Sequence, residues 1–219
     1  MGFAIVAGGN PNMAVPTSGI ALGDIAEGQL VKIKENSSPV EFYVAKHNYE
    51  PTLNGTGRTL LVRKDAYSSV VWGISGNYNA YAQSNIDAVA NGDYKGTLDQ
   101  ATLTAIGTTT FYYTVGNNNS NVVTLARAVF ILSVTELGGT GDNTEGSVLP
   151  TASILKTLSP SQATRTPVTS NRTMFYNYYA SSGAVSADVY AHTFLMRPCF
   201  TMPATAVFNK STMIFEGAA

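Results

Sequence analysis

A run of aromatic and polar residues near the C-terminus has the clearest potential for binding chemistry. Tyrosine offers a large contact area for little loss of entropy, and binding surfaces favour it together with Ser, Asn and small residues. We therefore predict a ligand or subunit interface here. The alternative is that the aromatic side chains fill the core, since alternation along a strand sends about half of them inward. The candidate interface residues are Tyr176, Tyr178, Tyr179, Asp188, Tyr190 and His192.

Two other groupings contain residue types that metal binding or nucleophilic catalysis would use. His47 lies near Glu41 and Glu50 in the sequence. Glu41 and His47 would lie on one face of a strand, whereas Glu50 lies beyond it, at a turn before a proline. A surface histidine beside solvated carboxylates is the favoured interpretation, with a metal site as the alternative. His192 and Cys199 resemble a thiol–imidazole pair, but no third group orients them. We predict that Cys199 is buried and inert.

Glycine-rich and oxygen-rich loops complete the set of candidate sites. Asp142-Asn143-Thr144-Glu145 offers oxygen ligands, so calcium is kept as an alternative although the loop has fewer carboxylates than a full calcium loop. Gly138-Gly139-Thr140-Gly141 lacks the lysine of a phosphate-binding loop and is predicted to be a turn. No catalytic constellation emerges, and we predict a non-enzymatic protein without a required cofactor.

Composition restricts the classes of partner. Charged residues make up 12% of the chain and the net charge is −1, which argues against a nucleic-acid partner. No apolar run approaches the ~18 residues of a membrane span, so no membrane insertion is expected. The N-terminus has no secretion signal, which indicates synthesis in a cytoplasm. A surface with so few charges favours association with other subunits, so a homo-oligomer is expected.

The pattern of glycines, prolines and apolar residues predicts two regions. Residues 1–27 are apolar, punctuated by Gly and Pro, and lack periodicity, which indicates an extended arm that docks on a neighbour. Residues 28–219 form an α+β domain with two short helices, several short antiparallel strands and long loops. The first helix is capped by Ser84, and the second by a capping box of Thr97 and Gln100 that buries Ala101.

Alternation and turn residues predict the strands. Residues 128–132 form a nearly continuous apolar run, which predicts a strand buried on both faces. Residues 158–172, around two prolines, are expected to be irregular. The remaining predicted strands form hairpins or close the domain, at residues 30–34 with 40–45, 59–63, 108–115 with 121–125, 174–179 with 185–190, and 196–200.

Four motifs, in order along the chain, resemble those of a family known as a domain of unknown function, number 6273. The segment from Val129 to Glu136 resembles its "vFLLS-x-x-E" signature, and Tyr81 to Tyr94 resembles its helix, although Val89-Ala90 replaces a Trp-Leu pair. Thr164 to Pro167 and Arg197 to Phe200 are similar to its "R-S/T-P" and "R-P-A-F" elements. The resemblance covers roughly residues 28 to 205.

This resemblance implies a C-type-lectin-like domain, similar in layout to formylglycine-generating enzymes. Their oxidase chemistry needs two cysteines, and this chain has one, so that activity is not implied. The family occurs often in prophages, which implies a virion structural protein, either a capsid decoration or a tail-associated subunit on the virion surface. Its expected partners are itself and other virion proteins. The alternative is an adhesin module whose tyrosine-rich surface binds a host surface glycan or protein.

Overall fold

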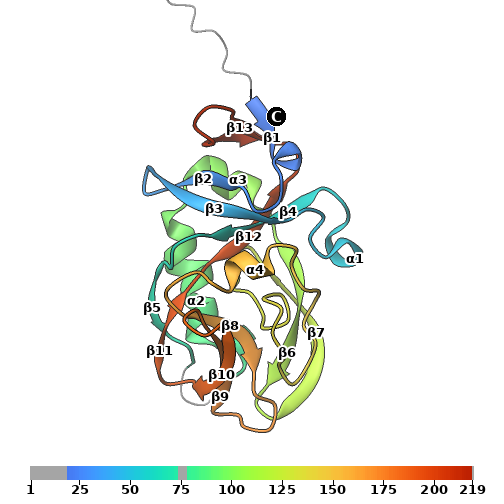
Figure 1. The fold of residues 1–219 in the computed structure, drawn as a ribbon, viewed down its shortest axis with the longest axis vertical. Coiled ribbons are helices and arrows are strands. Elements are labelled where there is room, and N and C mark those ends of the chain that lie inside the picture. Colours follow the sequence, from blue (N-terminus) through green and yellow to red (C-terminus); the bar gives the residue numbers. More distant parts are fainter. Residues whose placement is uncertain (1–18, 74–77, 219) are drawn as a thin grey trace, which may run out of the picture.

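The structure, a computed structural model, describes residues 19–73 and 78–218. Figure 1 shows an elongated domain in which the sheet of β2, β3, β4 and β12 crosses the upper half and smaller sheets fill the lower half. Within the described ranges the strands form five sheets, each with antiparallel pairing, and the helices are short. This confirms a sheet-rich α+β architecture.

The strands are distributed along the whole described chain. Their pairing order is β1-β13-β14, β10-β9-β8, β11-β5, β12-β4-β3-β2 and β6-β7. Their bounds are β1 Gly19–Ala21, β2 Leu30–Glu35, β3 Ser38–Lys46, β4 Arg58–Arg63, β5 Ser68–Val71, β6 Thr109–Gly116, β7 Asn119–Arg127, β8 Gln162–Pro167, β9 Met174–Tyr179, β10 Ala184–Val189, β11 Thr193–Met196, β12 Cys199–Pro203, β13 Ala206–Asn209 and β14 Phe215–Ala218.

The helices are single turns or little more, and most connect strands. The α-helices are α1 Pro51–Asn54, α2 Asn85–Val89, α3 Gln100–Ala105 and α4 Ala152–Leu155. The other helical turns are η1 Leu22–Asp24, η2 Tyr81–Gln83, η3 Ala90–Tyr94 and η4 Lys95–Thr97, of which η3 is a π-helix.

The predicted hairpin at residues 30–45 is confirmed as β2 and β3. Val31 pairs with Phe42 and Ile33 with Val40, so the apolar positions of the two strands lie opposite each other. Val31, Ile33 and Phe42 are fully buried, because alternation directs one face of the hairpin toward the core. Phe42 of β3 also contacts Phe200 of β12, with ring centroids 5.2 Å apart, so the two rings pack across β4, which lies between these strands in the sheet.

The structure differs from the prediction in the C-terminal part of the predicted arm, residues 1–27. Residues 1–18 lie outside the described residues, but β1 pairs with β13, and Leu22 and Ile25 are buried in the core. The Gly and Pro residues obscured this because a three-residue strand and one helical turn are too short to show a period. Residues 19–27 therefore belong to the folded domain.

The two predicted helix caps have different outcomes. Ser84 caps α2 as predicted, since its Oγ accepts a hydrogen bond from the backbone nitrogen of Asp87 at 3.1 Å. The Thr97 capping box is wrong. Asp99 caps α3 by accepting from the backbone nitrogen of Thr102 at 2.8 Å, and Ala101 is exposed. Asp caps a helix at least as well as Thr does. Because α3 begins two residues later than predicted, a different face of the helix points toward the core.

Two predictions about the middle of the chain are corrected. Residues 128–132 are largely buried, but they form no strand beyond one isolated bridge between Phe130 and Cys199. Within the predicted irregular stretch 158–172, residues Gln162–Pro167 form β8, and each of its side chains is buried. A hydrophobic pattern indicates burial, whereas strand formation depends on the partners available in the fold. β8 is buried although its sequence is polar, because its threonine hydroxyls and the Nη1 of Arg165 bond to internal partners.

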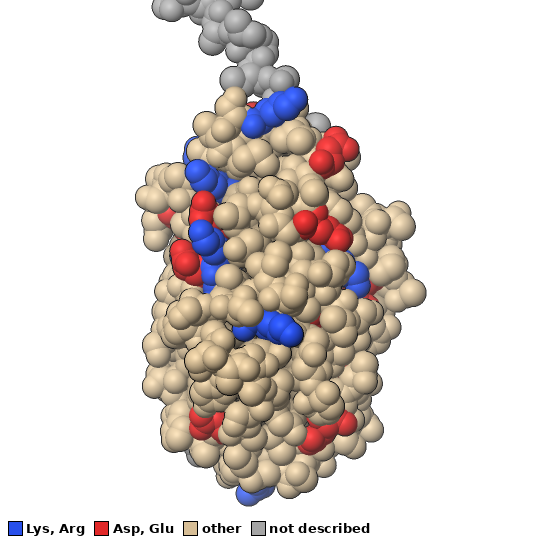
Figure 2. Space-filling model, viewed as in Figure 1, with Lys and Arg blue, Asp and Glu red and all other residues tan. Residues whose placement is uncertain are grey.

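The core is rich in stacked aromatic rings, and the surface is poor in charge. Phe111 stacks on Phe130 at a centroid distance of 4.5 Å and Trp72 on Phe175 at 4.6 Å. Such offset pairs stabilise a core beyond the area that they bury. Figure 2 shows Lys, Arg, Asp and Glu scattered over a face that is otherwise uncharged. None of the helices in the described ranges has the length and apolar character needed to cross a membrane.

Candidate functional site

The predicted interface residues all lie on or next to the β9–β10 hairpin, but on different faces of it. Tyr178 is 3% exposed and belongs to the core, so its assignment to an interface is wrong. Its ring packs beside Gly139, where an added Cβ would lie 3.3 Å from it. Tyr190 is half-buried and packs edge-on against Tyr78, with centroids 5.2 Å apart. The alternative interpretation, that aromatic residues fill the core, therefore holds for part of the set.

Tyr176 anchors the loop that was considered for calcium. Its hydroxyl donates to Asp142 Oδ1 at 2.5 Å, while Asp142 Oδ2 accepts from the backbone nitrogen and hydroxyl of Thr169. Burial acts to raise the pKa of Asp142, but these hydrogen bonds outweigh it and lower the pKa. Burial and the bond to Asp142 raise the pKa of Tyr176 to about 12.

The carboxylates of that loop do not converge on one point. Asp142 is engaged by Tyr176 and Thr169, whereas Glu145 is fully buried and accepts from the Thr114 backbone nitrogen and the Thr166 hydroxyl, both at 2.6 Å. No group of three or more His, Cys, Asp or Glu residues within residues 19–73 and 78–218 is arranged to hold a metal ion. The loop is thus tied into the fold by its own oxygens.

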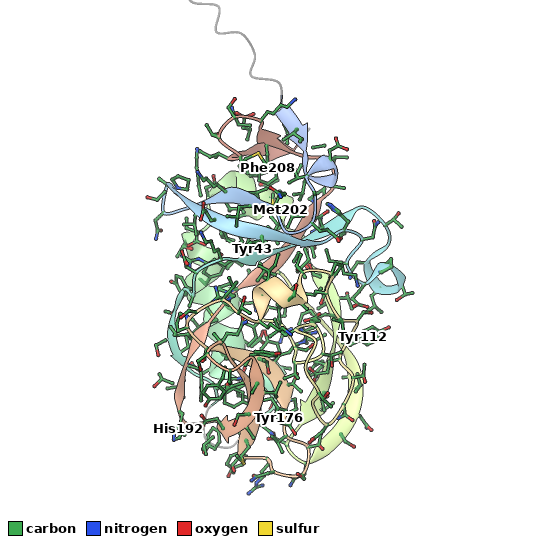
Figure 3. The ribbon with its side chains drawn as sticks, in the orientation of Figure 1. Tyr43, Tyr112, Tyr176, His192, Met202 and Phe208 are labelled. Carbon is green, nitrogen blue, oxygen red and sulfur yellow. The ribbon has the colours of Figure 1, made fainter. Side chains whose placement is uncertain are left out.

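Asp188 brings together the other members of the predicted set. Its Oδ1 lies 2.8 Å from Nδ1 of His192, and its Oδ2 accepts from the hydroxyl of Tyr179 at 3.4 Å. His192 is 62% exposed, so this group faces solvent. In Figure 3, Tyr176 and His192 lie at separate positions at the lower end of the domain. The hairpin therefore presents a polar, solvent-facing group of Tyr179, Asp188 and His192, separate from Tyr176.

The histidine and cysteine singled out in the sequence have structural partners. His47 is half-buried, and its ring nitrogens lie 2.9 Å from Thr59 Oγ1 and 3.0 Å from the Ile25 carbonyl oxygen. Cys199 is fully buried, and its thiol donates to the carbonyl oxygen of Phe130. Burial raises the pKa of this thiol well above its usual value, so it stays protonated and inert, as predicted.

A buried ion pair, which the sequence did not single out as a site, lies at the centre of the domain. Arg165 Nη1 donates to Glu136 Oε2 at 2.7 Å, and both side chains are fully buried. Glu136 also accepts from the Tyr49 hydroxyl at 2.5 Å and from the backbone nitrogen of Ser133 at 2.9 Å. The guanidinium lies 4.7 Å from the ring centroid of Phe111, a cation–π contact.

Electrostatics keep this pair in its charged and hydrogen-bonded state. Burial alone would lower the pKa of Arg165, but the charge of Glu136 outweighs it and the pKa is raised. Burial and then the charge of Glu136 raise the pKa of Tyr49 well above its usual value, so its phenol remains a donor. The group is therefore suited to hold the fold together rather than to exchange protons.

The four motifs meet around the segment 129–136, which we call the hub segment. Asn91 exchanges two hydrogen bonds with the backbone of Val129, at 2.9 and 3.2 Å. Tyr81 accepts from the Ile131 backbone nitrogen, and Arg165 donates to the Ile131 carbonyl oxygen at 2.8 Å. Phe130 and Cys199 exchange both backbone bonds, at 3.0 and 2.8 Å. Motifs far apart in sequence are thus joined by side-chain and backbone bonds in the core.

The signal for this network was present in the sequence, since Glu136 and Arg165 each lie in a motif. Their pairing could not be read from spacing, because 28 intervening positions separate them along a chain of irregular elements. The motif residues accordingly explain the scaffold, and the surfaces that could bind a partner lie elsewhere.

Comparison with known proteins gives one result at the level of the family. A search of curated proteins and a search of solved structures found no match. A model of a family described as a domain of unknown function, DUF6273, matches residues 56–204, which is more than half of the chain and contains the four motifs. This chain therefore belongs to the DUF6273 family.

Proposed function

We propose that this protein is a non-enzymatic structural subunit of a bacteriophage particle, a capsid decoration or tail-associated subunit that displays a C-type-lectin-like domain. In this proposal it is made in the bacterial host cytoplasm and ends on the virion surface, bound to copies of itself and to other virion proteins. The sheet-rich α+β architecture, the family's occurrence in prophages and the low surface charge support it.

One strand carries the proposal. Within residues 19–73 and 78–218, β7 pairs with β6 and with no other strand, so its outer edge has no strand partner, although Asn143 donates to the Ser120 carbonyl oxygen at 3.1 Å. Residues 119–124 are exposed on both faces of the strand. Val122 and Val123 are each 39% exposed, and no charged residue occurs between Asn119 and Ala126. Proteins usually protect an edge strand with charge, proline or a bulge, because an open edge pairs with other chains. An edge of this kind suits a subunit that adds a strand from a neighbour.

Two of the groups with chemical potential are buried, which supports a non-enzymatic role. The Cys199 thiol is protonated and bonded to a carbonyl oxygen, and the Arg165–Glu136 pair is buried among hydrogen-bond partners. Neither has the solvent access that a nucleophile or a general base needs.

Hydrogen exchange at low and high protein concentration tests the role of β7. If neighbouring copies pair along this edge, its outward amides should become protected as the concentration rises, while the amides bonded to β6 are protected throughout. A Val122→Lys, Val123→Lys double variant should abolish the concentration dependence, because lysine on an edge opposes strand addition. Val148→Lys is the matched control, since Val148 is 57% exposed and lies outside β7. Exchange that is independent of concentration in the unaltered protein would refute the proposal.

The second candidate is an adhesin module that binds a host surface glycan or protein. The group of Tyr179, Asp188 and His192 favours it, because an exposed histidine, a carboxylate and a tyrosine hydroxyl supply donors and acceptors together. A glycan array probed with the unaltered protein and with His192→Ala tests this candidate. A ligand lost in the variant would support it, and an array without any ligand would count against it.

A further inference from the structure

Glu50 is a buried residue, and one of its carboxylate oxygens has no partner among the residues that the structure describes. The residue is 5% exposed, and Oε1 has no hydrogen-bond partner within residues 19–73 and 78–218. The backbone is well anchored, since the Glu50 carbonyl oxygen accepts from the backbone nitrogens of Leu53 and Asn54, both at 2.9 Å. The residue has φ of 43°, in the left-handed region that non-glycine residues rarely adopt. The fold thus holds Glu50 at a fixed place while the described residues leave its Oε1 unsatisfied.

Two other carboxyl groups, those of Glu136 and Glu145, lie close to Glu50 in the fold or in the sequence around Gly146. A Cβ added to Gly146 would lie 3.1 Å from Glu50 Oε1 and 3.6 Å from Glu136 Oε1, so both carboxylates border the same backbone position. Glu145 is the preceding residue and is also buried. Arg165 is bonded to Glu136, and no ion pair reaches Glu50 or Glu145 in the described part of the chain. A cation would stabilise a carboxylate in such a place, and no Lys or Arg of the described residues supplies one.

A cavity of about 400 Å³ opens at Glu50. Its lining includes three residues with an aliphatic hydroxyl, Thr52, Thr144 and Ser147, together with the larger side chains of Tyr112 and Val122. This volume lies in the range of pockets for small organic ligands and is far larger than a metal ion needs. Tyr112, on β6, is labelled in Figure 3, and in that view it lies below α1. The lining residues are Glu50, Thr52, Tyr112, Val122, Thr144, Gly146 and Ser147.

We propose that this cavity binds an organic cation, a primary ammonium group on a short aliphatic stem. The ammonium would donate to Glu50 Oε1 and to the surrounding hydroxyls, and the stem would lie against Tyr112 and Val122. An aromatic wall beside a carboxylate suits such a ligand, because a cation is attracted to both. The same chemistry is offered by a free amine and by a lysine side chain of a partner protein.

Nuclear magnetic resonance titration with n-butylammonium tests this assignment on the full chain. The amide signals of Gly146 and Ser147 should shift and saturate, with a Kd on the order of 1 mM for so small a probe. The neutral isostere n-butanol should bind at least about tenfold more weakly, the equivalent of losing one charge-assisted hydrogen bond. N-acetyl-lysine methylamide distinguishes a free amine from the lysine side chain of a partner protein. If it binds more tightly than n-butylammonium does, the natural ligand is a lysine side chain.

Two variants and one matched control make the test specific. Glu50→Gln should abolish the saturable shifts, whereas Glu41→Gln should keep them, because it removes the same charge from a surface ion pair with Lys64. Ser147→Phe fills the cavity mouth while leaving Glu50 in place, so it should also abolish binding even if Glu50→Gln disturbs the fold. The proposal is overturned by equal binding of butanol, by retained binding in Glu50→Gln, by tighter binding of calcium than of the amine, or by no saturation with either amine probe.

Discussion

Replacing Arg165 with methionine removes the cation from the buried pair with Glu136 and keeps an unbranched, apolar side chain in place of the aliphatic part of the arginine. Glu136 retains its bonds from Tyr49 and Ser133 but loses its ion pair with Arg165, and the Ile131 and Tyr112 carbonyl oxygens lose a donor. Removing one partner of a buried ion pair costs about 3–5 kcal/mol. A domain of this kind is stable by about 5–15 kcal/mol, so the variant should approach the limit of folding.

Urea denaturation followed by circular dichroism measures this loss. Glu136→Gln should cost a similar amount, because it leaves Arg165 charged and without its partner. The double variant Arg165→Met, Glu136→Gln should cost clearly less than the sum of the two single variants, by about 2 kcal/mol or more, since neither charge then remains buried. A single variant that costs under about 1 kcal/mol, or a double variant equal to the sum, would refute the role given to this pair.

Three further predictions concern other parts of the fold. Asp142→Asn should lower the pKa of Tyr176 from about 12 toward its usual value, which an alkaline titration followed by tyrosinate absorbance measures. The stability that the bond between Tyr176 and Asp142 gives is fully present below pH ~10 and is lost as the pH rises through the raised pKa of Tyr176. Burial raises the pKa of Glu145, so its contribution favours folding at low pH and is lost as the pH rises through the raised pKa. Glu145→Gln should flatten that decline in urea midpoints, and an unchanged slope would contradict it. Leu22→Ala should lower the free energy of unfolding by about 2–5 kcal/mol because Leu22 is fully buried, whereas Val148→Ala should change it by less than about 0.5 kcal/mol. Equal effects of the two variants would contradict the assignment of residues 19–27 to the folded domain.

Local patterns predicted the elements whose stability comes from local or adjacent pairing. The hairpin of β2 and β3 and that of β6 and β7 each join neighbouring segments through a short turn, so alternation and turn residues were sufficient. The Ser84 cap was likewise predictable, because the bond to Asp87 spans only three residues.

The features that were missed depend on partners distant in sequence. The run 128–132 was predicted as a strand from its apolar character, but its backbone groups bond to Asn91, Arg165 and Cys199 instead of to a continuous neighbouring strand. Tyr178 was predicted to face a partner, and its burial against Gly139 depends on how the loop before β8 folds over the hairpin. Periodicity in one segment contains no information about which other segment covers it.

The native mass of the full-length protein, measured by light scattering over a range of concentrations, tests most directly the claim that this is an assembling subunit. The proposal predicts a defined oligomer, which the Val122→Lys, Val123→Lys variant should disrupt if β7 is the contact. Deleting residues 2–18, which leaves β1 and the buried Leu22 intact, shows whether the N-terminal segment adds to assembly. A monomer at every concentration, with and without residues 2–18, would contradict the proposal and favour a stand-alone binding module.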